Sequence, residues 1–221
     1  MREDMRKVIL ASSSPRRREL LATLALPYEI STAPVEEIPL EGESPKDLVQ
    51  RLALAKAKAV RTTNSQDIVL AADTIVVFRD KILGKPRDES EAKEMLLALR
   101  GNWHLVFTGV AVLAPPSLEL LAVECTYVLM RAYSLKEVEA YVNSGKAMDK
   151  AGAYGVQDEG FCPVAEIKGC YTNVMGLPLC LTVELLGKVG FDFEASPVQI
   201  CERATPLEFR GSHALRPPPG C

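Results

Sequence analysis

The sequence is poor in histidine, with only His104 and His213 among its 221 residues. A serine or cysteine nucleophile for acyl transfer usually needs a histidine base that an acid orients. No such set is evident here. His104 follows Trp103 where a strand is predicted to begin, which is typical of a structural residue. We therefore do not expect acyl-transfer chemistry.

The six cysteines form no C-x-x-C pair, which, with so few histidines, argues against a structural zinc site. Cys125 and Cys180 lie in apolar runs, as reduced core residues do. Long hydrophobic runs are also missing. None approaches the ~18–20 residues of a membrane span, and residues 8–11 are too short for a signal-peptide core. We expect a cytoplasmic protein without a membrane partner.

Positive charge is not in excess, because 26 lysines and arginines face 29 acidic residues, for a net charge of −3. Nucleic-acid binding usually requires a basic face, so we expect no nucleic-acid partner. The 48% of hydrophobic residues is ordinary for a globular protein. We predict one domain over residues 1–195. Residues 196–221 are rich in proline and without periodicity, which predicts a poorly ordered tail.

Strand and helix patterns alternate over the first half of the chain. Residues 7–12, 28–32, 68–78 and 82–83 are predicted strands, and 15–26, 45–61 and 89–100 are predicted helices. Two long strands follow over 105–113 and 120–131, then helices over 134–145 and from Pro178 to about Val189. Residues 151–177 are glycine-rich and predicted to be irregular. The class is α/β, or mixed α+β.

The segment from Val8 to Arg18 is the most informative. A buried strand ends at Ser12-Ser13-Ser14, and Pro15 suits the first turn of the helix that follows. Three arginines in that turn, beginning at Arg16, are unfavourable beside the positive end of a helix dipole. A bound anion would explain them, because hydroxyls, backbone N–H groups and guanidinium groups together bind phosphate. The alternative is a solvated basic turn.

Asp73 interrupts an apolar strand, where an unpaired charge is costly to bury. It could bind Mg²⁺ or activate water, and the alternative is a structural carboxylate.

Lys56 shares an apolar helix stripe with Leu48 and Leu52, so it either reaches water or meets an anion in a cleft. Lys85 lies in a loop stiffened by Pro86 and could meet a phosphate or be a simple surface lysine.

Two further segments carry weaker signals. The loop 149–157 is rich in small residues, and the Gln157 amide could both donate to and accept from a base edge. Glu36 and Glu37 follow the second predicted strand and could be metal ligands, or else solvated acids. Cations together with carboxylates favour metal-assisted attack of water on a phosphoanhydride.

Taken in order, these segments resemble the Maf family of nucleoside triphosphate pyrophosphatases over residues 7–189. The matching motifs are Ser12-Ser13-Ser14-Pro15-Arg16-Arg17, Val35-Glu36-Glu37, Glu43-Ser44-Pro45, Arg51-Leu52-Ala53 with Lys56-Ala57-Lys58-Ala59, Ala72-Asp73-Thr74, Gly84-Lys85-Pro86, His104 with Thr108-Gly109-Val110, Met148 to Gln157, and Val174-Met175-Gly176-Leu177-Pro178. Each motif alone is weak, and the ordered set is specific.

The resemblance implies an elongated mixed β-sheet flanked by helices, with a cleft between two lobes, similar to inosine triphosphate pyrophosphatase. It implies hydrolysis of a nucleoside triphosphate to monophosphate and pyrophosphate with Mg²⁺ or Mn²⁺. Asp73 would be the proton acceptor, and Asp73 and Glu36 the metal ligands. Substrate binding and selection would fall to Ser12, Ser14, Arg16, Lys56, Thr74, Lys85 and Gln157. A homodimer is an expectation that rests on the resemblance alone.

Arg16, Thr74 and Gln157 together resemble the subgroup that acts on dTTP and UTP rather than on 7-methyl-GTP. Asp158-Glu159 adds acidity directly after Gln157, which could alter base preference or metal affinity. A different class of function is a non-catalytic nucleotide-binding regulator of cell division and septum formation. Release of pyrophosphate distinguishes the enzyme from this regulator, and release of inorganic phosphate would instead indicate a phosphomonoesterase.

Overall fold

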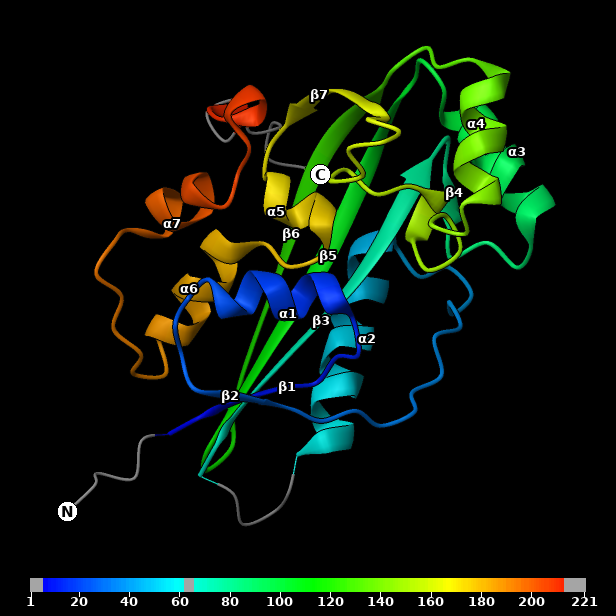
Figure 1. Ribbon diagram of the computed structural model, residues 1–221. Helices are drawn as coiled ribbons and strands as arrows, with labels where there is room; N and C mark the ends of the chain where they lie inside the picture. The colour runs from blue at the N-terminus through cyan, green and yellow to red at the C-terminus, as the bar shows by residue number, and fades with distance from the viewer. Residues whose placement is uncertain (1–5, 62–65, 213–221) are drawn as a thin grey trace.

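The computed structural model describes residues 6–61 and 66–212, and one mixed β-sheet forms its centre (Figure 1). Its strands are β1 (Val8–Leu10), β2 (Tyr28–Ile30), β3 (Ile68–Phe78), β4 (Lys81–Leu83), β5 (Trp103–Ala114), β6 (Leu118–Met130) and β7 (Val164–Lys168). Their spatial order is β2-β1-β3-β5-β6-β7, with β4 paired to the end of β3. β1 runs parallel to β2 and β3, and the other pairs are antiparallel. The predicted mixed α/β class is confirmed.

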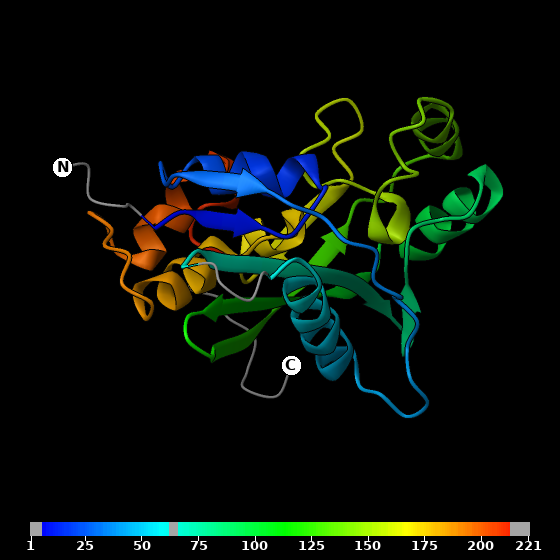
Figure 2. The ribbon, with the colours of Figure 1, turned by 90° about the horizontal axis from the view of Figure 1, so that it is seen from below.

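Helices cover both faces of this sheet, with α2 on one face and α1 and α6 on the other (Figure 2). The helices are α1 (Pro15–Ala22), α2 (Pro45–Val60), α3 (Glu89–Leu99), α4 (Leu135–Asn143), α5 (Tyr171–Met175), α6 (Leu179–Gly187) and α7 (Pro197–Arg203), with the 3₁₀ turns η1 (Ala151–Ala153) and η2 (Leu207–Phe209). None of the helices within the described ranges has the length and apolar character needed to cross a bilayer.

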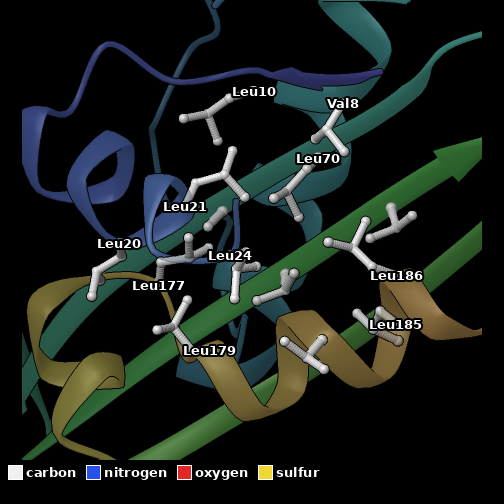
Figure 3. Packing of buried hydrophobic residues seen from close by; sticks show 14 of the residues in the cluster. Val8, Leu10, Leu20, Leu21, Leu24, Leu70, Leu177, Leu179, Leu185 and Leu186 are labelled. Atoms are coloured by element: carbon white, nitrogen blue, oxygen red, sulfur yellow. The ribbon is translucent and has the colours of Figure 1, made fainter. Parts of the chain in front are cut away.

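The apolar run at the start of β3 is buried on both faces, as its composition predicts. Leu70 and Ala72 pack in the cluster between the sheet and helices α1 and α6. Val69 and Ala71 point to the opposite face and pack against α2. Successive strand residues alternate between faces, so a strand covered on both sides must be apolar throughout. Figure 3 shows the first cluster, in which Leu20, Leu21 and Leu24 lie near Leu177 and Leu179, and Leu186 lies further along α6.

Gly109 in β5 allows α2 to approach the sheet closely. A Cβ atom at this position would lie only 2.2 Å from the carbonyl oxygen of Val49 in α2, so a larger residue would displace the helix. Gly109 is also the antiparallel partner of Asp73 in β3. The close contact therefore fixes α2, and with it Lys56, relative to Asp73.

A second apolar cluster lies at the other end of the sheet, under α3, α4 and η1 (Figure 1). It contains Leu96 and Leu99 from α3, Val138 from α4, and Tyr154 from the loop after η1. One prediction differs from the structure nearby. The predicted irregular segment 151–177 contains β7 and α5 as well as η1. Both elements are only five residues long, so periodicity does not reveal them.

The segment predicted as a poorly ordered tail contains one short helix. Residues 197–203 form α7, which begins with a capping box between Ser196 and Gln199 and has Pro197 in its first turn. Cys201 of this helix is completely buried. The prolines of this segment suggest disorder by composition, but one of them, Pro197, lies in the first turn of a helix. Residues 213–221, the rest of the predicted tail with His213 and Cys221, lie outside the described residues.

Candidate active site

A cavity of about 610 Å³ collects most of the residues that the sequence singles out. The elements around it are the first turn of α1, the segment after β2, α2, β3 and the loop 149–157. Its lining includes all but one of the predicted site residues: Ser12, Ser14, Arg16, Lys56, Asp73, Thr74, Lys85 and Gln157. The exception is Glu36, which is exposed and is not among the lining residues. Its neighbour Glu37 lines the cavity.

Lys56 joins two carboxylates in this cavity. Its Nζ lies 2.5 Å from Oδ1 of Asp73 and 2.6 Å from Oε1 of Glu37. Asp73 is buried, with 5% of its surface exposed, so its charge needs this partner. Of the two alternatives left open for Lys56, its position in the cavity agrees with the cleft, and its role in binding an anionic ligand stays a prediction. Lys58, two residues later, is exposed and pairs with Glu119 instead.

Glu37 is held in its ionised form by its surroundings. Burial alone would raise its pKa, but the hydrogen bond and charge of Lys56, with smaller contributions from Lys85 and Arg17, lower the pKa below its ordinary value. Lys85 is exposed at the edge of the cavity. The cavity therefore presents two carboxylates surrounded by cations. Such a set can hold a divalent cation and an anionic substrate together.

Arg17 is a cavity residue that the sequence places among the three arginines of this turn but does not single out as a site residue. Its Nε donates to the carbonyl oxygen of Gly176 at 2.8 Å and its Nη2 to Oγ1 of Thr74 at 3.0 Å. Its Nη1 donates to Oγ of Ser12 at 3.3 Å. Burial lowers the pKa of Arg17, and the charge of Asp73 acts in the opposite direction. The signal was its spacing: Arg17 precedes the buried Leu20 and Leu21 by three and four residues, which places it on the inner face of α1.

Arg16 lines the cavity and pairs with the loop 149–157. Its Nη1 donates to Oδ2 of Asp149 at 2.8 Å and its Nη2 to the carbonyl oxygen of the same residue at 3.3 Å. Burial raises the pKa of Asp149, but hydrogen bonds from Lys150 and Arg16 outweigh it and lower the pKa. Lys150 is itself buried, at 8% exposure, and lies 3.7 Å from Oδ2 of Asp158. This ion-pair network joins the first turn of α1 to the loop.

Gln157 presents a polar atom without a partner. Its Oε1 is buried and accepts no hydrogen bond within the described part of the chain, while the residue lines the cavity. A buried acceptor of this kind is stabilised when a ligand donates to it.

His104 is buried and does not line the cavity. Its Nε2 lies 2.7 Å from the Tyr154 hydroxyl. Its expected structural role agrees with this position.

The first turn of α1 leaves its backbone groups accessible to a ligand. The Ser14 side chain makes no capping hydrogen bond to α1. Ser12 Oγ instead accepts from Ser14 N at 3.2 Å, which folds the serine segment into a tight turn. Helix N-termini bind anions through such N–H groups. The anion-binding interpretation of this segment stays a prediction, and the turn lines the cavity as it requires.

Comparisons with known proteins agree on one family. A dTTP/UTP pyrophosphatase from Bacillus cereus (strain ATCC 10987 / NRS 248) is 46% identical over 190 residues, which are 86% of this chain and 93% of the relative. One from Symbiobacterium thermophilum is 46% identical over 187 residues, 85% and 96% of the two chains. A solved nucleoside-triphosphatase (dITP/XTP pyrophosphatase) from Mycobacterium abscessus matches 57% of this chain and 75% of its own, with a TM-score of 0.36 and 16% identity. The family model described as Maf-like protein matches residues 7–189, and the chain belongs to this family.

Proposed function

We propose that this protein hydrolyses nucleoside triphosphates, with dTTP and UTP favoured, to the nucleoside monophosphate and pyrophosphate. The observation that carries the proposal is the buried Asp73 carboxylate, paired with Lys56 at 2.5 Å inside a cavity lined by further cations. A cavity that only bound a nucleotide would have no need of a buried carboxylate among its phosphate-binding cations. Relatives named dTTP/UTP pyrophosphatase, at 46–47% identity over most of both chains, support the same reaction.

The triphosphate would bind along the cationic wall of the cavity. Ser12 and Ser14 at the start of α1 would donate to phosphate oxygens, together with Arg16 and Lys85. Arg16 now pairs with Asp149, so a phosphate that approaches would share or replace that partner. The phosphates would then lie across the cavity from Gln157.

The donor set fits a divalent cation such as Mg²⁺ or Mn²⁺. Asp73 and Glu37 supply carboxylate oxygens on one wall of the cavity, and hard cations prefer such oxygens. Glu36, predicted from the resemblance as a ligand, is exposed and outside the lining, and Glu37 is the better placed of the two. When bound, the cation would neutralise the negative charge on phosphate oxygens.

Asp73 would orient a water molecule and accept its proton. The water oxygen forms a bond to the α-phosphorus, the bond from this phosphorus to the bridging oxygen breaks, and pyrophosphate leaves. Lys56 holds Asp73 in position and lowers the electrostatic penalty of its burial. Arg17 donates hydrogen bonds to both Thr74 and Ser12, and so fixes the positions of these two residues relative to each other on the cavity wall.

Base selection would rest on Gln157, with Thr74 and Arg16. The Gln157 amide can accept from N3–H and donate to a carbonyl of a pyrimidine such as thymine or uracil. Its Oε1 is buried and unpaired in the described structure, which is what a specificity contact requires before substrate arrives. By analogy with base readout, such a contact contributes about 1–3 kcal/mol. A cytoplasmic location, a homodimer and the absence of nucleic-acid and membrane partners stay predictions.

The experiment is a substrate panel. The purified chain is incubated with dTTP, UTP, CTP, 7-methyl-GTP and ATP, each with Mg²⁺ or Mn²⁺, and the products are separated by chromatography. We expect dTMP and UMP with pyrophosphate. Release of inorganic phosphate would contradict the reaction, and turnover of 7-methyl-GTP alone would contradict the assigned specificity. Tight nucleotide binding without turnover would favour the regulator.

A further inference from the structure

Three cysteines meet in the core, away from the active-site cavity. The Sγ atoms of Cys170, Cys180 and Cys201 all lie within 4.8 Å of one another. Cys170 caps the start of α5, Cys180 is in α6, and Cys201 is in α7, which packs beside α6 (Figure 1). The three side chains are 0–4% exposed, and none of them lines the cavity.

Polar groups surround this thiol cluster within an otherwise apolar core. The Thr172 hydroxyl lies 3.1 Å from Cys170 Sγ and 3.2 Å from Cys201 Sγ. This hydroxyl accepts from Leu179 N at 2.9 Å, so its hydrogen is available to a sulfur. The backbone N–H of Asn173 also donates to Cys170 Sγ, at 3.3 Å. Burial and the neighbouring thiols raise the pKa of Cys170, so binding requires that a metal ion displace the thiol proton.

The spacing of the sulfurs fits one shared metal ion. Three sulfurs about 2.3 Å from a common ion in a trigonal plane lie about 4.0 Å apart. Cys170 Sγ and Cys201 Sγ are 3.4 Å apart, and all the spacings are at most 4.8 Å. Changes of about 0.6 Å in the Cys170–Cys201 spacing, and of at most about 0.8 Å in the others, would bring the three atoms to that geometry.

The number of ligands limits which ion this could be. Zinc in structural sites takes four ligands, and no fourth cysteine or histidine joins this cluster among the described residues. The cluster is closed to solvent, so water is a poor fourth ligand. Soft thiolate ligands favour Cu(I) over hard cations. A three-sulfur set without a fourth donor therefore favours a soft ion of low coordination number.

We propose that Cys170, Cys180 and Cys201 form a three-coordinate thiolate site that binds a soft metal ion, Cu(I). Cys201 lies beyond residue 189, where the match to the family model ends. The ion would therefore fasten the C-terminal segment to α5 and α6. Binding would release thiol protons and would stabilise the folded chain in proportion to ion concentration.

The test is an anaerobic titration of the reduced full-length chain with Cu(I), in competition with a chromogenic Cu(I) chelator. Cys162, which is exposed, and Cys221 are first replaced by serine. Cys125 is then the one cysteine that remains outside the cluster. We expect one Cu(I) per chain, three sulfur neighbours by X-ray absorption, and a higher melting temperature with copper. Cys201→Ser and Cys180→Ser should each weaken binding at least tenfold, and Cys125→Ser should not.

Circular dichroism and the melting temperature of the metal-free variants establish that each is folded. If Cys201→Ser does not fold, Cys201→Ala and Cys180→Ala provide the same comparison with a smaller polar change. Unchanged Cu(I) affinity in a folded cluster variant would overturn the proposal. So would tighter binding of Zn²⁺ than of Cu(I), or a Cys170–Cys201 disulfide that forms in air while the reduced chain takes up no copper. These outcomes do not depend on nucleotide hydrolysis.

Discussion

The Nζ atom of Lys56 in α2 lies 2.5 Å from Oδ1 of Asp73 in β3, seventeen residues further along the chain. The pair forms because α2 packs against the sheet at Gly109, the strand partner of Asp73, where no Cβ atom separates helix from strand. The same lysine reaches Glu37 at 2.6 Å. One side chain thus positions both carboxylates of the candidate active site.

Replacement of this lysine should greatly lower the activity. Lys56→Met retains the apolar stem but leaves Asp73 and Glu37 without their shared partner. We expect turnover of dTTP to fall roughly 100-fold, as when one charged or hydrogen-bonding group is removed from an active site. Lys58→Met is the control, because Lys58 is exposed and pairs with Glu119. Equal losses in the two variants would contradict the assigned position of Lys56.

Asp73→Asn tests the base directly. The amide keeps the size of the side chain and can still contact Lys56, but it cannot accept the proton of water. We expect kcat to fall by about 10²–10⁴, the usual contribution of a general base. Thermal unfolding should remain cooperative. Asp80→Asn, in the exposed turn after β3, should leave steady-state kinetics unchanged. Near-normal turnover by Asp73→Asn would exclude Asp73 as the base.

Arg17 should be more important than its neighbour Arg18. Arg17 donates to Gly176, Thr74 and Ser12, and a lysine cannot reproduce this fork. Loss of two of these hydrogen bonds predicts that Arg17→Lys destabilises the fold by about 1–3 kcal/mol and raises KM. Arg18 is exposed, so Arg18→Lys should change neither quantity. Chemical denaturation and steady-state kinetics on both variants provide the comparison.

Glu37 and Glu36 can be separated by paired variants. Both side chains are exposed, but Glu37 lines the cavity and contacts Lys56, whereas Glu36 is outside the lining. Glu37→Gln should therefore require a higher Mg²⁺ concentration for half-maximal activity, since a carboxylate oxygen is lost. Glu36→Gln should show the wild-type metal dependence. The reverse result would restore the assignment that the family resemblance implies.

His104 should make the fold sensitive to mild acid. Burial lowers its pKa from 6.5 to about 3, so the folded state stays unprotonated while the unfolded state takes up a proton below pH 6.5. The unfolded state then binds more protons, and stability falls as the pH falls. Linkage gives a loss of about 2 kcal/mol between pH 7 and pH 5. Urea denaturation should show this loss in wild type and His213→Gln but not in His104→Gln; an equal loss in all three would contradict it.

Local sequence patterns were sufficient for much of the fold and of the site. The apolar run of β3, the alanine-rich α2 and the capping box of α4 each specify their element through neighbouring residues. The same holds for Asp73, whose charge within an apolar strand requires a partner. The sequence did not decide whether the Lys56 side chain reaches water or a cleft, because the pattern of one helix does not show which residues of the sheet lie opposite it.

The remaining features depend on contacts between distant segments. Glu37 rather than Glu36 enters the cavity, and no periodicity exists in that loop to distinguish adjacent acids. The role of Arg17 depends on Gly176, which is 159 residues away. The three-cysteine cluster likewise joins positions up to 31 residues apart, without any short motif. Composition does not indicate α7 within residues 196–212, because the helix depends on one buried cysteine and one capping box among the prolines.

The most direct test of the account is the position of isotopic oxygen after hydrolysis of dTTP in H₂¹⁸O. Water attack at the α-phosphorus, with Asp73 as the base, predicts one ¹⁸O in dTMP and none in pyrophosphate, as resolved by mass spectrometry. Label in pyrophosphate would place the attack at the β-phosphorus, and label in inorganic phosphate would indicate attack at the γ-phosphorus. Either result would contradict the proposed arrangement of substrate, Asp73 and the cationic wall.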